Sequence, residues 1–280
     1  MKKITRRSFL AATGLTAAAL ALTACGGSSS STASSAASSA AASSEAASTS
    51  AAAGELTTVE AGKLTMATNA AFPPYEMTTD SGEFEGIDVE TAQAIADKLG
   101  LELQIDDMDF DAALLSVQQG KADIVMAGVT VTDERKAVMD FSDSYATGIQ
   151  SIIVPEGSDI ASPDDLAGKK IGTQRGTTGY IYCSDDFGDE NVVAYDNGLT
   201  AVQALNNGQV DAVVIDNAPA KEFVAANPGL TILDTSYAEE DYAIGMAKGS
   251  SLEAAINSAL EELKADGTLQ AIVDKYITTE

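Results

Sequence analysis

Histidine and tryptophan are absent from this 280-residue chain, cysteine occurs twice and arginine only four times. The absence of histidine excludes Ser-His-Asp and Cys-His catalysis and every histidine-based metal site. Two cysteines, Cys25 and Cys183, are too few for a zinc site, so we expect neither a metal nor a cofactor. Basic residues number 16 against 42 acidic ones, which gives a net charge of -26 and a pI near 4.1. This charge disfavours binding to nucleic acid and to anionic lipid headgroups.

The first 24 residues have the pattern of an export signal. A basic start, MKKITRR, precedes the apolar run Phe9–Leu22, which is too short for a convincing membrane span. The run ends in LTAC, residues 22–25, which is similar to the cleavage box of bacterial lipoproteins and makes Cys25 the expected lipidation site. The string TRRSFL is also similar to a twin-arginine signal, so general secretion and the twin-arginine route both stay open.

Residues 25–56 are nearly all serine, alanine and glycine. Such a segment buries too little apolar area to offset the entropy lost on ordering, so we expect a disordered tether. About 30 flexible residues have an r.m.s. span of roughly 30 Å. The expected location is therefore extracytoplasmic, with the folded part held by a lipid anchor at the outer face of the cell membrane.

From Gly62 onward, short apolar runs alternate with amphipathic segments. The strings KLTMAT, LELQI and DIVMAG are typical of strands, and DVETAQAIADKLG predicts a helix that ends at Gly100. DAALLSVQQG predicts a further helix with Asp111 as its N-cap. The alternation predicts an α/β fold with a mainly parallel sheet.

One unit of sequence occurs twice, 88 residues apart. LLSVQQGKADIVMAG starts at Leu114 and VQALNNGQVDAVVID at Val202, and each reads as a helix, a glycine stop and a short apolar strand. Two copies predict two similar α/β lobes, with a ligand beyond the carboxyl ends of their strands. The matched pairs are Gly120 with Gly208, Asp123 with Asp211, and Gly128 with Asp216.

Several ordered motifs between about residue 60 and the end of the chain carry a family resemblance. They are ATNAAFPPYE, GEFEGIDVETAQAIADKLG, AGVTVTDERKAVMDFSDSY, RGTTG, DAVVID and DYAIGMAKGS. Together they resemble the bacterial extracellular solute-binding proteins of family 3, the amino-acid receptors of ABC importers.

The resemblance implies a type II periplasmic-binding-protein fold, in which two α/β lobes are joined by two hinge crossings. We expect the first lobe to span residues 57–148 and 241–280, and the second lobe to span residues 149–240. The crossings are expected near residues 146–151 and 239–243.

The resemblance also implies how the head of an amino acid is held. Arg135 matches the arginine that binds the α-carboxylate, and a guanidinium can do so with two parallel hydrogen bonds. Asp216 matches the carboxylate that binds the α-ammonium, although its position also suits a helix N-cap. The remaining matches at this end of the ligand are Gly128, Thr130, Thr177 and Thr178.

The ligand side chain is expected to meet a second group of residues. Phe72 and Phe110 match aromatic residues that enclose the stem of the side chain, with core packing as the alternative. Asn69 stands where some relatives carry an aspartate, which disfavours a dedicated lysine or arginine receptor. Gln174 and its neighbour Arg175 could reach the same pocket. If Arg175 faces inward, a polar or acidic ligand is favoured, and if it faces outward, it is a surface residue.

The sequence therefore predicts a monomeric binding lipoprotein, not an enzyme. It captures a free L-amino acid between two lobes and delivers it to the permease subunits of an ABC transporter. One alternative is a lipoprotein that senses an amino acid without transport. Another is an exported dehydratase on the same fold, which would need an added general acid in the cleft.

Overall fold

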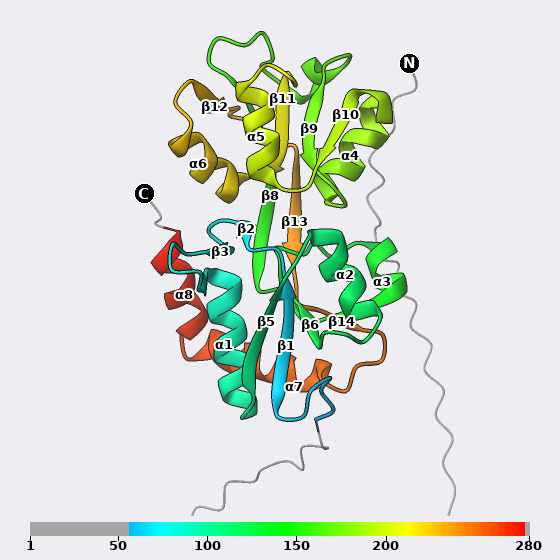
Figure 1. The fold of residues 1–280 in the computed structure, drawn as a ribbon, viewed down its shortest axis with the longest axis vertical. Helices are drawn as coiled ribbons and strands as arrows, with labels where there is room; N and C mark the ends of the chain where they lie inside the picture. Colours follow the sequence, from blue (N-terminus) through cyan, green and yellow to red (C-terminus); the bar gives the residue numbers. More distant parts are fainter. Residues whose placement is uncertain (1–55, 278–280) are drawn as a thin grey trace, which may run out of the picture. The chain divides into compact units, whose positions relative to one another are not determined.

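The computed structural model describes residues 56–277. The expected export signal, the lipidation site Cys25 and almost all of the expected tether lie outside the described residues, as do residues 278–280. The described residues belong to one compact unit, Ser50–Glu280. Within it, two large sheets and one small sheet are flanked by helices (Figure 1).

The first large sheet, which forms the first lobe, has the strand order β5-β1-β6-β14-β7. Strand β1 is parallel to both β5 and β6, whereas β14 is antiparallel to β6 and β7. Helices α1, α7 and α8 pack against one another in this lobe. The strands are β1 (Lys63–Thr68), β5 (Glu102–Asp107), β6 (Ile124–Val125), β7 (Met139–Phe141) and β14 (Gly245–Ala247); the helices are α1 (Ile87–Leu99), α2 (Phe110–Gln118), α3 (Asp133–Val138), α7 (Glu253–Ala265) and α8 (Thr268–Tyr276).

A small antiparallel sheet belongs to the same lobe, and its strands are β2 (Ala71–Phe72), β3 (Glu76–Thr78) and β4 (Phe84–Glu85). Helix α1 ends at Gly100 as expected, in the left-handed conformation that glycine favours. The N-cap position of α2 is Asp109, so the predicted N-cap Asp111 is wrong. Asp111 instead lies in the first turn, where a carboxylate favours the positive end of the helix dipole.

The second large sheet, which forms the second lobe, has the order β10-β9-β11-β8-β12, and β13 also pairs with β8. Strand β9 is parallel to β10 and β11, whereas β8 is antiparallel to β11, β12 and β13. The strands are β8 (Ala146–Pro155), β9 (Ile171–Gln174), β10 (Val192–Tyr195), β11 (Ala212–Asp216), β12 (Leu230–Ile232) and β13 (Ala238–Tyr242); the helices are α4 (Thr178–Phe187), α5 (Gly198–Asn206) and α6 (Asn217–Ala226), with 3-10 turns at Pro163–Leu166 and Asp189–Asn191.

Each large sheet is mixed, so the prediction of a mainly parallel sheet is only half correct. Three strands per sheet are parallel, and these are the strands of the strand–helix alternation. The antiparallel members of the second sheet include β8 and β13, which carry the chain between the lobes. The alternation in the sequence does not report the direction of such connecting strands.

The two crossings lie side by side. Strands β8 and β13 pair antiparallel from Ala146 with Tyr242 to Gln150 with Ala238, and Figure 1 shows both running between the sheets. The end of β13 also meets the loop after β6, because Thr130 forms a bridge with Tyr242. The expected lobe boundaries, at 148/149 and 240/241, fall inside these two strands, and their placement stays a prediction.

The two copies of the internal repeat share an aspartate that has the same structural role in each lobe. A side-chain oxygen of Asp123, just before β6, accepts a hydrogen bond of 2.7 Å from the amide of Thr65 in β1. In the second copy Asp211, just before β11, accepts one of 2.7 Å from the amide of Lys170, just before β9. In each lobe, therefore, one carboxylate fixes the register between two parallel strands.

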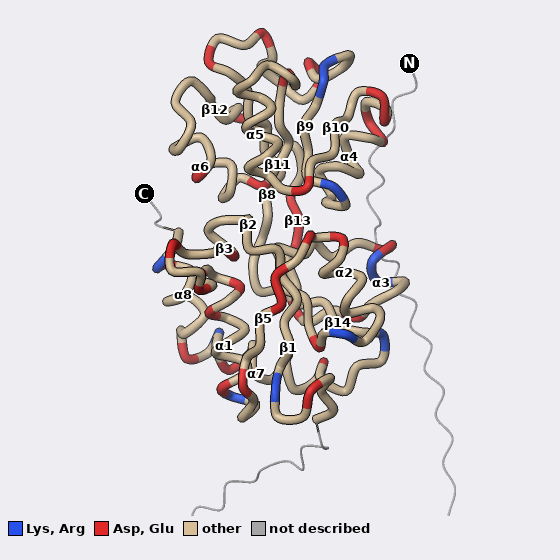
Figure 2. The backbone as a smooth tube through the Cα atoms, in the orientation of Figure 1, with Lys and Arg blue, Asp and Glu red and all other residues tan. Residues whose placement is uncertain are grey.

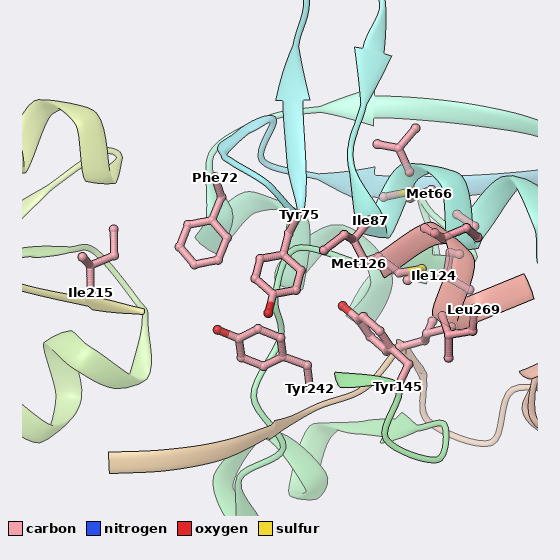
Figure 3. Close-up of a cluster of buried hydrophobic side chains, with 14 of the residues drawn as sticks. Met66, Phe72, Tyr75, Ile87, Ile124, Met126, Tyr145, Ile215, Tyr242 and Leu269 are labelled. Atoms are coloured by element: carbon pink, nitrogen blue, oxygen red, sulfur yellow. The ribbon is translucent and has the colours of Figure 1, made fainter. Parts of the chain in front are cut away.

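The core of the first lobe reaches the cleft through aromatic residues. Tyr75 and Tyr242 meet edge to face with their ring centroids 5.3 Å apart, and Phe72 stacks on Tyr75 at 5.9 Å. Figure 3 shows these rings with Tyr145 beside the aliphatic core. Cys183 is a free thiol buried in the core of the second lobe. Among residues 56–277, no helix has the length and apolar character needed to span a membrane.

Gly86 is the position where a side chain is least tolerated. Its φ is +130°, and an added Cβ would lie 2.6 Å from the carbonyl carbon of Tyr75 and closer still to the oxygen. Both obstacles are backbone atoms, which cannot rotate away. We expect Gly86→Ala to lower the free energy of unfolding by about 3 kcal/mol or more. Urea denaturation measures this, with Gly82→Ala as the control, because Gly82 also has positive φ but nothing within 4 Å of an added Cβ. Equal losses in both variants would contradict the steric explanation.

Candidate functional site

A cavity lies where the carboxyl ends of β1, β6, β9 and β11 converge. Its free space is about 20 Å³, close to the minimum for one water molecule. The residues that line the cavity are Asn69, Phe72, Glu76, Phe110, Ala127, Gly128, Thr130, Arg135, Gln174, Thr177, Thr178 and Asp216. All ten predicted ligand residues are among them, although their roles toward a ligand stay predictions.

Arg135 is held in place by backbone oxygens from both lobes. It lies in the first turn of α3, where its amide donates to the capping side chain of Thr132. Nη1 donates to the carbonyl of Thr130 at 2.8 Å, and Nη2 donates to the carbonyl of Gly176 in the second lobe at 3.1 Å. The guanidinium also stacks over the ring of Phe110, 5.4 Å from its centroid. Only 8% of the residue is exposed, and this burial lowers the pKa of Arg135.

Asp216 ends β11 and sits at the N-cap position of α6, but its side chain does not cap that helix. Its carboxylate accepts hydrogen bonds from the hydroxyl of Tyr242 and from Nε2 of Gln150, the latter at 2.9 Å. The N-cap alternative is therefore not the role of its side chain. Burial raises the pKa of Asp216 to about 7.

A second buried carboxylate, Glu240 on β13, joins residues of both lobes. Its Oε2 accepts from Thr130 at 3.1 Å, from Thr178 at 2.9 Å and from Nε2 of Gln150 at 3.0 Å. Figure 2 shows this acidic strand between the two sheets. Glu240 thus bonds to two predicted ligand residues, Thr130 and Thr178, and shares the donor Gln150 with Asp216.

The backbone of Gly128 is held in place by Asp88. The amide of Gly128 donates to Oδ2 of Asp88 at 3.0 Å, and the hydroxyl of Tyr145 donates to Oδ1 at 2.7 Å. Gly128 has φ +55°, and an added Cβ would lie 2.9 Å from the ring of Phe72. The backbone therefore approaches the cavity closely at this point. Burial raises the pKa of Asp88 to about 6, although the bonds from Gly128 and Tyr145 oppose that rise.

The turn after β9 closes the cavity from the second lobe. Thr177 caps α4 by accepting from the amide of Tyr180 at 3.3 Å, and Thr178 is the first residue of that helix. Nε2 of Gln174 donates across the cleft to Oδ1 of Asn69 at 2.9 Å, and Nδ2 of Asn69 donates to the carbonyl of Met108. Asn69 and Gln174 therefore form a contact between the lobes.

Arg175 faces away from the cavity. Its side chain is 56% exposed and lies 3.9 Å from Asp196, and it donates to the carbonyl of Ala194. A polar or acidic ligand was expected only if Arg175 faced inward. Because Arg175 faces outward, it is a surface residue.

Sequence reasoning did not single out Glu76, Asp88, Gln150 or Glu240. The signal for Glu240 is the period of two in β13, which places it on the same buried face as Tyr242. Glu76 directly follows Tyr75 at the end of the FPPYE motif, but nothing in that motif separates a buried carboxyl from an exposed one.

The site presents groups of both charges to the cavity. It offers a fixed guanidinium, buried carboxyl groups, hydroxyls and a helix N-terminus, which complement a zwitterion. Among the described residues, no cluster of cysteine, aspartate and glutamate could hold a metal ion.

Comparison with known proteins identifies similar solute-binding proteins. Residues 64–279 match the family described as bacterial extracellular solute-binding proteins, family 3. The L-cystine-binding protein TcyJ of Escherichia coli K12 is 33% identical over 222 residues, 78% of this chain and 83% of its own length. A probable histidine-binding protein of Neisseria gonorrhoeae is 34% identical over 224 residues, 77% and 83% of the two chains.

Solved structures share the fold. A mutant of ArgBP from T. maritima is 40% identical, with a TM-score of 0.74, over 78% of this chain and 96% of its own. The expected type II periplasmic-binding-protein fold is confirmed by these neighbours, and the family consists of solute-binding proteins, not enzymes. The chain belongs to the bacterial extracellular solute-binding proteins, family 3.

Proposed function

We propose that this protein captures a free L-amino acid between its two lobes and delivers it to the permease of an ABC importer. The observation that carries the proposal is the pairing of Arg135 with Asp216 in one cavity between the lobes. The guanidinium takes the α-carboxylate with two parallel hydrogen bonds, and Asp216 with Glu240 beside it takes the α-ammonium. The relatives bind amino acids with different side chains, which supports a shared site for the head group.

Closure of the second lobe then completes the site. Thr130 and Gly128 come from the first lobe, whereas Thr177 and Thr178 come from the second. A ligand that contacts both sets shifts the equilibrium toward the closed form by its difference in affinity for the two forms. The closed form is the one that a permease would recognise.

The proposed location follows from the leader and the tether. Cys25 carries the lipid, and residues 26–56 let the folded part reach a permease in the same membrane. Mass spectrometry of the mature protein tests this, because lipidation adds acyl mass to an N-terminal Cys25. An unmodified N-terminus at another residue would contradict the anchor. The protein acts as a monomer.

Isothermal titration calorimetry with the twenty L-amino acids tests the proposed function. We expect at least one amino acid to bind with a dissociation constant in the micromolar range or below, about -8 kcal/mol or better. D-enantiomers serve as controls, because they misplace the side chain when the head group is held. If no L-amino acid binds, the proposed function is wrong.

A further inference from the structure

Glu240 accepts hydrogen bonds from side chains of both lobes. Its Oε2 lies 3.1 Å from the hydroxyl oxygen of Thr130, in the loop after β6, and 2.9 Å from that of Thr178, the first residue of α4. Only 6% of Glu240 is exposed, and the two threonines are 5% and 2% exposed. Their hydroxyl oxygens are 3.5 Å apart. Glu240, Thr130 and Thr178, which we call the clasp, thus join the lobes at the head-group end of the site.

The acceptor of the clasp is fixed to the strands that connect the lobes. Glu240 lies on β13, where it pairs with Gly148 of β8. From β8, Nε2 of Gln150 donates to Oε2 of Glu240 at 3.0 Å and to Oδ2 of Asp216 at 2.9 Å. Tyr182 on α4 is a further hydrogen-bond neighbour of the carboxylate. The carboxylate therefore belongs to the hinge, whereas the two hydroxyls belong to segments that move apart when the lobes open.

The positions of the hydroxyl protons decide what the clasp presents to the cavity. A threonine hydroxyl has one proton and two lone pairs. A carboxylate is a stronger acceptor than a second hydroxyl, so both protons point to Glu240. Thr130 and Thr178 line the cavity, whereas Glu240 is not among its lining residues. Toward the cavity the two hydroxyls therefore present lone pairs, which suit a donor such as an α-ammonium group.

We propose that Glu240 is a positioning residue, which orients the hydroxyls of Thr130 and Thr178 as acceptors for the α-ammonium and holds the lobes together. This inference rests on the proposed function, because it concerns the same head-group site. Glu240 acts through the two hydroxyls, and Arg135 remains the partner of the α-carboxylate.

The clasp also favours the closed form of the protein. Two other contacts cross the cleft, from Arg135 to the carbonyl of Gly176 and from Gln174 to Asn69. Each of these is a single hydrogen bond, whereas the clasp supplies two bonds to one charged acceptor, and bonds to charged groups contribute more than neutral ones. All its atoms belong to the chain, so it favours closure before a ligand contributes. Loss of the clasp lowers the closed fraction and, with it, the apparent affinity.

Small-angle X-ray scattering of the ligand-free protein tests the contact between the lobes. We expect Glu240→Gln to increase the radius of gyration, because an amide oxygen is a weaker acceptor and carries no charge. Thr178→Val should do the same, because it removes the hydroxyl of the second lobe and keeps the size of the side chain. Glu239→Gln is the matched control, since Glu239 is the exposed neighbour of Glu240 on β13.

Equal radii of gyration in wild type, Glu240→Gln and Thr178→Val overturn the clasp. This result needs no ligand, so it is independent of whether the proposed function is correct. Thr178→Val keeps the measurement decisive if Glu240→Gln fails to fold.

A double-mutant cycle, measured by calorimetry with the amino acid that binds the wild-type protein, tests the orientation of the hydroxyls. Glu240→Gln alone is expected to lower affinity by at least about tenfold. Thr130→Val should lose about tenfold in the wild-type background but no more than about twofold in Glu240→Gln, where the hydroxyl is no longer oriented.

An equal loss from Thr130→Val in both backgrounds overturns the positioning role, because a merely structural or long-range electrostatic role of Glu240 would not couple to that hydroxyl. The proposed function would survive that result. Failure of every amino acid to bind overturns the proposed function and the acceptor role together, whereas the scattering result still decides the contact between the lobes.

Discussion

Arg135→Ala is expected to lower the affinity for the amino acid by about a hundredfold to ten-thousandfold. Two charge-assisted hydrogen bonds to the α-carboxylate contribute about 1.5–3 kcal/mol each, and their loss leaves that carboxylate facing Asp216 and Glu240 without a cation. Calorimetry with the amino acid that binds the wild-type protein measures the loss.

Two further variants separate charge from geometry. Arg135→Lys keeps the charge but cannot donate in parallel, so its affinity is expected to lie between those of wild type and Arg135→Ala. Arg175→Ala is the matched control, because Arg175 is exposed and faces away from the cavity. Circular dichroism must show that Arg135→Ala is folded, since Arg135 also bonds to Thr130 and Gly176. Wild-type affinity in folded Arg135→Ala would show that the carboxylate is bound elsewhere.

The repeated unit was readable in the sequence because its physical roles are local. A glycine that ends a helix and an aspartate that precedes a strand leave the same letters in both copies. In the structure, Gly120 and Gly208 both have positive φ, and Asp123 and Asp211 both hold a neighbouring strand. Two lobes could therefore be predicted, whereas the antiparallel course of β8 and β13 could not, because strand direction depends on distant partners.

The candidate site divides in the same way. Arg135 lies beyond the end of β6 and Asp216 ends β11, and both residues line one cavity. The acidic residues behind them escaped prediction, because burial decides their chemistry. Glu240 and its neighbour Asp241 both carry an acidic side chain in the string AEED. Glu240 is buried, whereas Asp241 is exposed. The acidity of the site thus became visible only from packing.

This acidity has a consequence for stability. The free energy of unfolding of the ligand-free protein is expected to fall as pH rises from 5 to 8. The pKa of Asp216 is raised from 3.8 to about 7 by burial. A raised carboxyl pKa means that the folded state holds its proton while the unfolded state has lost it. The stabilising contribution of protonated Asp216 is complete below pH 3.8 and is lost as pH rises through 7. Asp216 accounts for about 3 kcal/mol between pH 5 and 8.

The chain suits this measurement because it contains no histidine, whose titration would obscure this range. Surface carboxyls that lie beside cations or amide donors, such as Asp140 and Asp266, have lowered pKa values. Their stabilising contributions are lost only at lower pH, so they are fully present and constant between pH 5 and 8. Asp88, with a pKa raised to about 6 by burial, adds to the same downward slope. Urea denaturation at half-unit intervals between pH 5 and 8 measures the slope.

Asp216→Asn should reduce this slope and raise stability at pH 8. The asparagine can still accept from Gln150 and donate to the hydroxyl of Tyr242, so the buried contacts have replacements. Asp185→Asn, at an exposed position of α4, is the matched control for removing one negative charge. An unchanged slope in Asp216→Asn would mean that Asp216 is already ionised in the free protein.

A saturating amino acid is expected to flatten the slope as well, because its α-ammonium keeps Asp216 ionised in the folded state. The pH dependence of stability and the capture of the ligand would then have one cause, a buried carboxyl group that exchanges a proton for a cation.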